Sequence, residues 1–167
     1  METQQNNRLK FNSPILLFGA SPIDLSTLKI VQKCKSWPVL AADGGVMAAI
    51  NAGLLPNVVI GDMDSATDLD LLPASVRQIR LSGQDDTDFE KCLHLLDTPL
   101  IVGIGFLDGR FDHSLAALDA LTRMEHDRPV LLAGKHDVLL RLKGDVKIAL
   151  DRGSRVSIWP LGCQHFI

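Results

Sequence analysis

Short runs of apolar residues recur along the chain up to Gly134, and each ends abruptly at glycine or a polar residue. Residues 15–18 and 58–60 are continuous runs of this kind, as is typical of strands buried on both faces. Segments with apolar residues at helical spacing separate them. The expected strands are 15–19, 39–42, 76–81, 100–103 and 129–133, with a further strand that begins at Pro56 and carries two aspartates at its tip. The expected helices are 24–35, 46–51, 87–97 and 112–126. This alternation predicts an α/β fold with a mostly parallel sheet and helices on both faces.

The pattern changes after Gly134. Residues 137–142, 146–150 and 155–161 are short alternating stretches separated by glycine-containing turns, without a helical segment between them. We expect them to open an antiparallel sheet. The sequence therefore predicts an α/β domain at residues 1–134 and the beginning of a β domain at residues 135–167.

The overall composition narrows the functional classes. The 167 residues accommodate one domain with a small appendage, and the net charge of -3 argues against a nucleic-acid surface. The first apolar run is too short for a signal peptide or a membrane span. Cys34, Cys92 and Cys163 lack the spacing of a zinc or redox site, as expected of thiols in a reducing compartment. We expect a cytoplasmic protein with no membrane or nucleic-acid partner.

Two aspartates, Asp62 and Asp64, follow the apolar run at residues 58–60. In an extended chain their side chains leave on the same side, so the two carboxylates would share one small volume. Two such charges about 4 Å apart repel by roughly 4 kcal/mol at an effective dielectric constant of about 20. A shared proton or a bound cation relieves this repulsion, and Mg²⁺ suits an oxygen-only pair. The alternative is that both residues cap turns and never meet.

Further polar residues follow the other expected strands. Asp43 comes directly after strand 39–42, and the acidic loop 84–88 comes after strand 76–81. Because ligands bind outside the carboxyl ends of parallel strands, these segments are expected to converge at one edge of the sheet. This convergence favours a metal site over turn capping.

The acidic loop also has a local interpretation. Residues 87–90 fit a capping box, in which Asp88 complements the positive end of a helix. Capping does not explain why Asp85 and Asp86 crowd the same turn. Lys91 lies one turn further along and is within reach of a phosphate, although the sequence alone favours a solvated surface lysine.

A glycine-rich loop precedes the longest expected helix. Its glycines do not match the spacing of a dinucleotide-binding loop, and the chain has no P-loop or nucleophile-elbow motif. The backbone amides near Gly109, the guanidinium of Arg110 and the helix start would form an anion site suited to phosphate. We expect Asp112 to be the helix N-cap, and His113 to be either a first-turn surface residue or a ligand.

Four motifs in this order resemble the thiamine pyrophosphokinase (thiamine diphosphokinase) family. They are Ala42-Asp43-Gly44-Gly45, Ile60-Gly61-Asp62-Met63-Asp64-Ser65, the segment from Gln84 to Cys92, and Gly109-Arg110-Phe111-Asp112-His113. The resemblance covers residues 15–134, and residues 156–162 are similar to the run that opens the family's second, all-β domain. It implies a homodimer that uses Mg²⁺ to transfer a pyrophosphoryl group from ATP to thiamine, giving thiamine diphosphate and AMP.

The resemblance also implies roles for individual residues. The implied Mg²⁺ ligands are Asp62, Asp64 and Asp88, and the implied substrate contacts are Asp43, Gln84, Arg110 and Asp112. Thr87, Lys91, Gly109 and His113, which lie in the same motifs, are further candidate substrate contacts. Gln84 would approach thiamine, whereas Asp43, Arg110 and Asp112 would face the nucleotide. Either Asp85 or Asp88 would orient or deprotonate the thiamine hydroxyl, and this choice stays open.

Two departures from the family pattern and two competing functions remain. Asp108 adds a negative charge near the expected phosphates, and most of the family's β domain lies beyond the residues present.

One competing function is a nucleotide-sugar transferase that uses Asp62 and Asp64 as a D-x-D motif with Mn²⁺. The other is a nucleotide-binding regulatory module without turnover.

Overall fold

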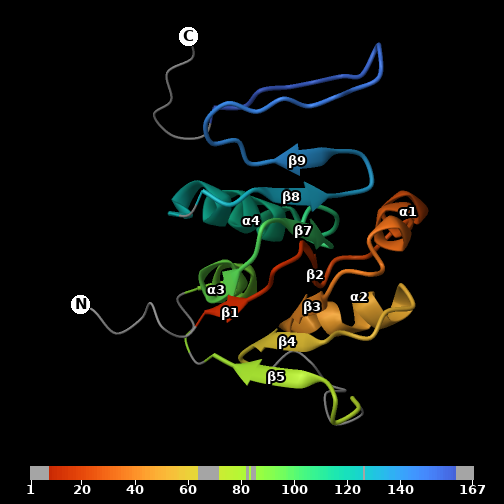
Figure 1. Ribbon diagram of the computed structural model, residues 1–167, viewed down its shortest axis with the longest axis vertical. Helices are drawn as coiled ribbons and strands as arrows, with labels where there is room; N and C mark the ends of the chain where they lie inside the picture. The colour runs from red at the N-terminus through yellow and green to blue at the C-terminus, as the bar shows by residue number, and fades with distance from the viewer. Residues whose placement is uncertain (1–7, 64–71, 82, 84–85, 126, 161–167) are drawn as a thin grey trace.

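The main feature of the fold is one seven-stranded sheet, seen in a computed structural model that describes residues 8–63, 72–81, 83, 86–125 and 127–160. Its strand order is β5-β4-β3-β2-β7-β8-β9 (Figure 1). Neighbouring strands are parallel except β8 and β9. The strands are β2 (Ile15–Phe18), β3 (Val39–Ala42), β4 (Val58–Gly61), β5 (Arg77–Arg80), β7 (Ile101–Ile104), β8 (Val130–Ala133) and β9 (Val138–Leu140). The predicted mostly parallel sheet is confirmed.

Helices cover both faces of this sheet, as predicted. The described helices are α1 (Leu25–Lys33), the 3-10 turn η2 (Asp43–Gly45), α2 (Val46–Asn51), α3 (Asp88–Leu95) and α4 (Phe111–Arg123). Leu17 and Leu40 pack in a cluster with the buried residues of α3 and α4, whereas Leu16 and Ala41 pack with those of α1 and α2. Alternate residues of one strand thus enter opposite cores. None of the described helices has the length and apolarity to cross a bilayer.

A second, two-stranded sheet fixes the start of the described chain. β1 (Leu9–Lys10) pairs in parallel with β6 (Leu96–Asp97), directly after α3. The backbone N–H of Phe11 donates to the carbonyl oxygen of Asp97 at 2.8 Å. Strands of two residues are too short to produce an alternating pattern, so the sequence did not predict this pairing.

The antiparallel part begins within the main sheet. β9 pairs with β8, and the chain then continues past this edge of the sheet, opposite β5 (Figure 1). The prediction of strands at 146–150 and 155–161 is wrong for the described residues, because residues 141–160 contain no strand. A pair of strands alone is only marginally stable in water, and the described chain offers these segments no further strand. The domain division at residue 134 stays a prediction.

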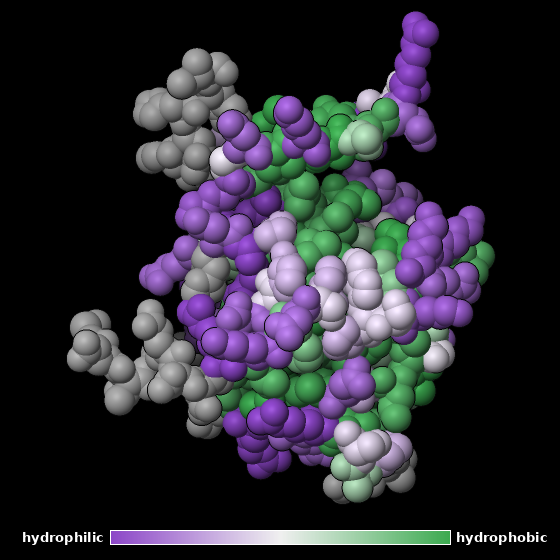
Figure 2. All heavy atoms as spheres, viewed as in Figure 1, coloured by the Kyte–Doolittle hydropathy of each residue, from purple (hydrophilic) through white to green (hydrophobic). Residues whose placement is uncertain are grey.

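The apolar side chains of this last segment are exposed. They are Leu142, Val146, Ile148, Leu150, Val156, Ile158 and Trp159. Figure 2 shows hydrophobic side chains at the surface in the upper part of the view, where this segment lies in Figure 1. The alternation that suggested strands is therefore present, but no layer among the described residues covers it.

Candidate active site

Three carboxylates from separate elements meet at the carboxyl ends of β3 and β4. Asp43 begins η2 directly after β3, Asp62 follows β4, and Asp88 is the first residue of α3. Each offers an oxygen, and these oxygens lie within 4.8 Å of one another. Asp43 is fully buried, whereas Asp62 and Asp88 are 30% and 29% exposed. The cluster is therefore closed behind Asp43 and accessible from the side of the other two aspartates.

Glycines allow this close approach of strand ends. A Cβ atom at Gly61 would lie 2.6 Å from the Cβ of Asp43, so only glycine fits beside that carboxylate. A Cβ at Gly45 would lie 2.1 Å from the carbonyl oxygen of Phe18, at the end of β2. The turn after β3 therefore packs directly on the neighbouring backbone, which holds Asp43 at the sheet edge.

The start of α3 is fixed by a capping box. The backbone N–H of Glu90 donates to Thr87 Oγ1 at 3.3 Å, and the backbone N–H of Thr87 donates to Glu90 Oε2 at 3.1 Å. Glu90 is buried and pairs with Arg123 of α4 at 2.5 Å. Thr87 is thus the N-cap, as the local interpretation predicted. Its expected contact with substrate stays a prediction.

Lys91 belongs to the carboxylate cluster. Its side chain is 7% exposed, and Nζ donates to Asp88 Oδ1 at 3.0 Å and to Asp62 Oδ2 at 3.3 Å. Burial acts to lower the pKa of Lys91, but the hydrogen bonds and charges of Asp88 and Asp62 outweigh it and raise the pKa. The expectation of a solvated surface lysine is wrong, because α3 packs this face against the end of β4.

The backbone turns sharply between the two aspartates of the D-x-D motif. Met63 has φ of 67°, a left-handed conformation that is uncommon outside glycine, asparagine and aspartate. The extended geometry assumed for Asp62 and Asp64 therefore does not continue past Gly61, where β4 ends. Asp64 lies outside the described residues, as do Gln84 and Asp85 of the acidic loop.

The glycine-rich loop after β7 lies against the end of β2. Gly105 has φ of 81°, and a Cβ there would lie 2.6 Å from the carbonyl oxygen of Gly19. A Cβ at Gly109 would lie 2.8 Å from Ser21 Oγ. Asp108 accepts a hydrogen bond from the backbone N–H of Lys135 at 2.7 Å, which ties this loop to the turn between β8 and β9. Asp108, which departs from the family pattern, therefore has a structural role in holding this loop.

Arg110 and Asp112 form an exposed ion pair at the start of α4. The distances are 2.5 Å from Nη2 to Oδ2 and 3.1 Å from Nε to Oδ1. The hydrogen bond from Arg110 lowers the pKa of Asp112, and the same bond raises the pKa of Arg110. The expectation that Asp112 caps the helix is wrong: the N-cap is Arg110, and Asp112 lies within the first turn. His113 is exposed beside them.

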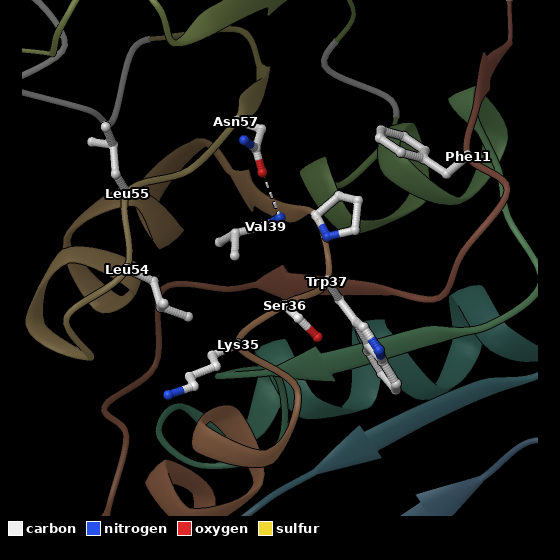
Figure 3. A pocket seen from close by; sticks show the side chains of 9 residues that line it. Phe11, Lys35, Ser36, Trp37, Val39, Leu54, Leu55 and Asn57 are labelled. Carbon is white, nitrogen blue, oxygen red and sulfur yellow. Dashed lines mark hydrogen bonds between the residues drawn. The ribbon is translucent and has the colours of Figure 1, made fainter.

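A separate open pocket lies at the other end of the strands, away from the carboxylate cluster (Figure 3). Its lining includes Trp37, Val39 at the start of β3, Leu54 and Asn57 just before β4. The Asn57 side chain accepts a hydrogen bond from the backbone N–H of Val39 at 2.8 Å. Because these residues lie at the amino ends of the strands, this pocket is distinct from the carboxylate cluster.

Most of the chain matches the sequence model of a known protein family. The sequence pattern described as "Thiamin pyrophosphokinase, catalytic domain" matches residues 30–132, more than half of the chain. The match includes the carboxylate cluster, Lys91 and the Arg110–Asp112 pair.

The chain belongs to this thiamin pyrophosphokinase family. A search among curated protein sequences found no match. The resemblance noted from the four sequence motifs is therefore confirmed at the level of the family.

Solved thiamin pyrophosphokinases share the fold. The one from Candida albicans is 17% identical with a TM-score of 0.57, over 81% of this chain and 68% of that chain. The one from Geobacillus thermodenitrificans is 23% identical with a TM-score of 0.60, over 72% and 59%. The yeast enzyme is 18% identical with a TM-score of 0.61, over 77% and 63%. The chain thus spans about two thirds or less of each of these three chains.

The donor set of the carboxylate cluster fits a hard divalent cation. Mg²⁺ binds oxygen ligands at about 2.1 Å, so oxygens on opposite sides of the ion lie about 4.2 Å apart. The three aspartate oxygens, within 4.8 Å of one another, lie close to that spread. Asp43 lies with Asp62 and Asp88 in this cluster, although the family motif implied that it faces the nucleotide. The sequence did indicate that Asp43 would lie near the other two aspartates, because it directly follows a strand.

Proposed function

We propose that this chain carries the nucleotide- and metal-binding part of a thiamine pyrophosphokinase. The reaction is Mg²⁺-dependent transfer of a pyrophosphoryl group from ATP to the hydroxyl of thiamine, giving thiamine diphosphate and AMP. The supporting observation is the cluster of Asp43, Asp62 and Asp88 within the segment that matches the family. In this proposal residues 1–134 form the catalytic domain, and residues 135–167 begin the β domain that would contact thiamine.

The carboxylate cluster is the proposed metal site. Asp62 and Asp88 would hold Mg²⁺ together with Asp64, and Asp43 would close the site from its buried side. Bound Mg²⁺ would neutralise charge on the transferring phosphoryl oxygens. Glu90 supports this arrangement from behind, because its contacts with Thr87 and Arg123 hold Asp88 at the start of α3.

The start of α4 is the proposed phosphate site. Gly109, whose φ is 133°, and the first turn of α4 present backbone amides at the end of the sheet. Arg110 is 71% exposed, so its guanidinium is accessible to phosphate oxygens while Asp112 keeps it oriented. His113 lies beside this pair and is the remaining candidate contact. These groups would orient the nucleotide and stabilise negative charge without a protein nucleophile.

The thiamine side of the site rests on the acidic loop. We propose Gln84 as a thiamine contact, and Asp85 or Asp88 as the group that orients the attacking hydroxyl. Asp88 is also one of the three aspartates of the carboxylate cluster, and it accepts a hydrogen bond from Lys91 at 3.0 Å. An Asp85→Asn variant distinguishes the two. If Asp85 orients the hydroxyl, this variant should bind Mg²⁺ normally but lose turnover, whereas unchanged turnover would assign the role to Asp88.

Two further properties complete the proposal. We propose a homodimer, which analytical ultracentrifugation would test. We also propose a cytoplasmic location, which rests on the dispersed cysteines; Cys34 and Cys92 are free thiols in the structure.

Product analysis tests the proposed reaction. The protein is incubated with Mg²⁺, ATP and thiamine, and the products are separated by chromatography. We expect AMP and thiamine diphosphate in equal amounts. ADP with thiamine monophosphate would instead show a simple kinase. ATP binding without any product would favour the regulatory module, and transfer from a nucleotide sugar in the presence of Mn²⁺ would favour the D-x-D transferase.

A further inference from the structure

The ammonium group of Lys91 lies inside the carboxylate cluster. It is 3.0 Å from Asp88 Oδ1 and 3.3 Å from Asp62 Oδ2, on a side chain that is only 7% exposed. Two of the three aspartates that would hold a metal ion thus already share a cation that belongs to the protein. This contact joins residues 29 positions apart, at the end of β4 and in the first turns of α3.

The surroundings of Lys91 hold its ammonium in place. Two of its three N–H donors are used by the aspartates, and the helix that carries it is attached to α4 through Glu90 and Arg123. In the metal-free protein, moving this ammonium away would break both hydrogen bonds and leave two adjacent carboxylates without their shared cation. Such a movement is unfavourable because like charges at this separation repel.

The charges of the cluster suggest what Lys91 does. Asp43, Asp62 and Asp88 bring carboxylates together within the described part of the site, and the ammonium of Lys91 offsets one of their formal negative charges. A positive charge at this position also repels an incoming metal ion, so it weakens binding of the free ion.

We propose that Lys91 is a fixed internal counter-ion that limits the affinity of this cluster for a free divalent cation. The cluster then binds Mg²⁺ strongly only when nucleotide phosphates supply further oxygen ligands, and it releases the ion with the products. Mg²⁺ suits this arrangement, since it is usually held by one or two carboxylates together with substrate phosphates. The inference rests on the metal site of the proposed function and adds to it a residue that tunes metal affinity.

Three lysine variants test the proposal. Lys91→Met removes the charge and keeps an unbranched apolar stem, Lys91→Arg keeps the charge, and Lys29→Met changes an exposed lysine on α1 as a control. The full chain is titrated with Mg²⁺ alone, without nucleotide, by isothermal titration calorimetry. We expect Lys91→Met to bind Mg²⁺ at least about tenfold more tightly than the unchanged protein. Lys91→Arg and Lys29→Met should bind it as the unchanged protein does.

The other outcomes overturn the proposal. Weaker Mg²⁺ binding by Lys91→Met would show that the lysine only aligns the carboxylates. Unchanged Mg²⁺ binding with weakened ATP binding would show that it contacts phosphate. If Lys91→Met is unfolded without metal, circular dichroism during a Mg²⁺ titration replaces the calorimetry: recovery of the helical signal is expected, and its absence contradicts the proposal.

The metal titration is independent of turnover. Failure to form thiamine diphosphate would overturn the proposed reaction and leave the effect of Lys91 on metal affinity standing. Conversely, an active protein whose Lys91→Met variant binds free Mg²⁺ no more tightly would retain the proposed function and lose this inference.

Discussion

Arg123 of α4 contacts the buried carboxylate of Glu90 on α3, with 2.5 Å between Nη2 and Oε1. The other oxygen of this carboxylate accepts the backbone N–H of Thr87, so one side chain both caps α3 and attaches it to α4. Asp88 and Lys91 lie in the same first turns. The position of the carboxylate cluster therefore depends on a contact that is not part of it.

Replacing Arg123 by alanine should destabilise the protein, because a buried carboxylate would lose its charged partner. Exposure of Arg123 moderates the effect, and we expect the free energy of unfolding to fall by about 1–2 kcal/mol. Asp119→Ala is the matched control, since Asp119 contacts the same arginine in an exposed pair worth about 0.5 kcal/mol or less. Urea denaturation measures both, and equal losses would contradict the role given to Glu90.

Gly61→Ala tests the close approach of β4 to Asp43. The new Cβ would lie 2.6 Å from the Cβ of Asp43, so one of the two strand ends must move. We expect a loss of about 1–3 kcal/mol in the free energy of unfolding, together with weaker Mg²⁺ binding as Asp43 is displaced. Unfolding by denaturant and calorimetric titration give the two values. A variant that matches the unchanged protein in both would show that the strand ends are not in contact.

The left-handed backbone at Met63 predicts a difference between two apolar replacements. Met63 packs against the cluster that includes the buried residues of α1 and α2, and both Met63→Leu and Met63→Ile keep that packing approximately. Only isoleucine is β-branched, which makes φ of 67° much less favourable. Met63→Ile should be less stable than Met63→Leu by about 1 kcal/mol in thermal unfolding. Equal stability would argue that this turn is not left-handed in solution.

Asp24 predicts a pH dependence at the start of α1. The backbone hydrogen bond from Thr27 and the side-chain hydrogen bond from Ser26 lower the pKa of Asp24 from 3.8 to about 2. Its charge therefore stabilises the fold above pH 3.8, and this stabilisation is lost as the pH falls through about 2. Asp24→Asn keeps a capping side chain without the charge.

Thermal unfolding of both forms between pH 6 and pH 2 measures the effect of Asp24. We expect the unchanged protein to be the more stable at neutral pH and the difference to disappear near pH 2. A difference that stays constant across this range would contradict the lowered pKa.

Much of the fold was predictable because strands buried on both faces leave a strong local pattern. α2 begins and ends where the sequence predicted, and Gly53 follows it closely. β4 was predicted in place, but it is shorter than expected, since it begins at Val58 and ends at Gly61. The segment after β9 was not predictable in the same way. Alternation at residues 146–150 indicates a strand only when a neighbouring strand is available, and the pattern contains no information about that neighbour.

The candidate site was predictable in part for a similar reason. Position after a strand identified Asp43 and Asp62, because it depends only on the order of elements. Lys91 was misjudged, since its burial depends on which face of α3 meets the end of β4, and that contact joins distant parts of the chain. The pairing of Arg110 with Asp112 was missed because the spacing of the two residues does not determine where α4 begins.

The most direct test of the central claim follows the β-phosphorus of ATP. The protein is incubated with Mg²⁺, thiamine and ATP labelled at the β-phosphate, and an Asp62→Asn variant serves as the comparison. The proposed reaction predicts that the label appears in thiamine diphosphate with the unchanged protein and that Asp62→Asn, though folded, transfers almost none. Label that remains in ADP, or equal transfer by Asp62→Asn, would contradict pyrophosphoryl transfer at this carboxylate cluster.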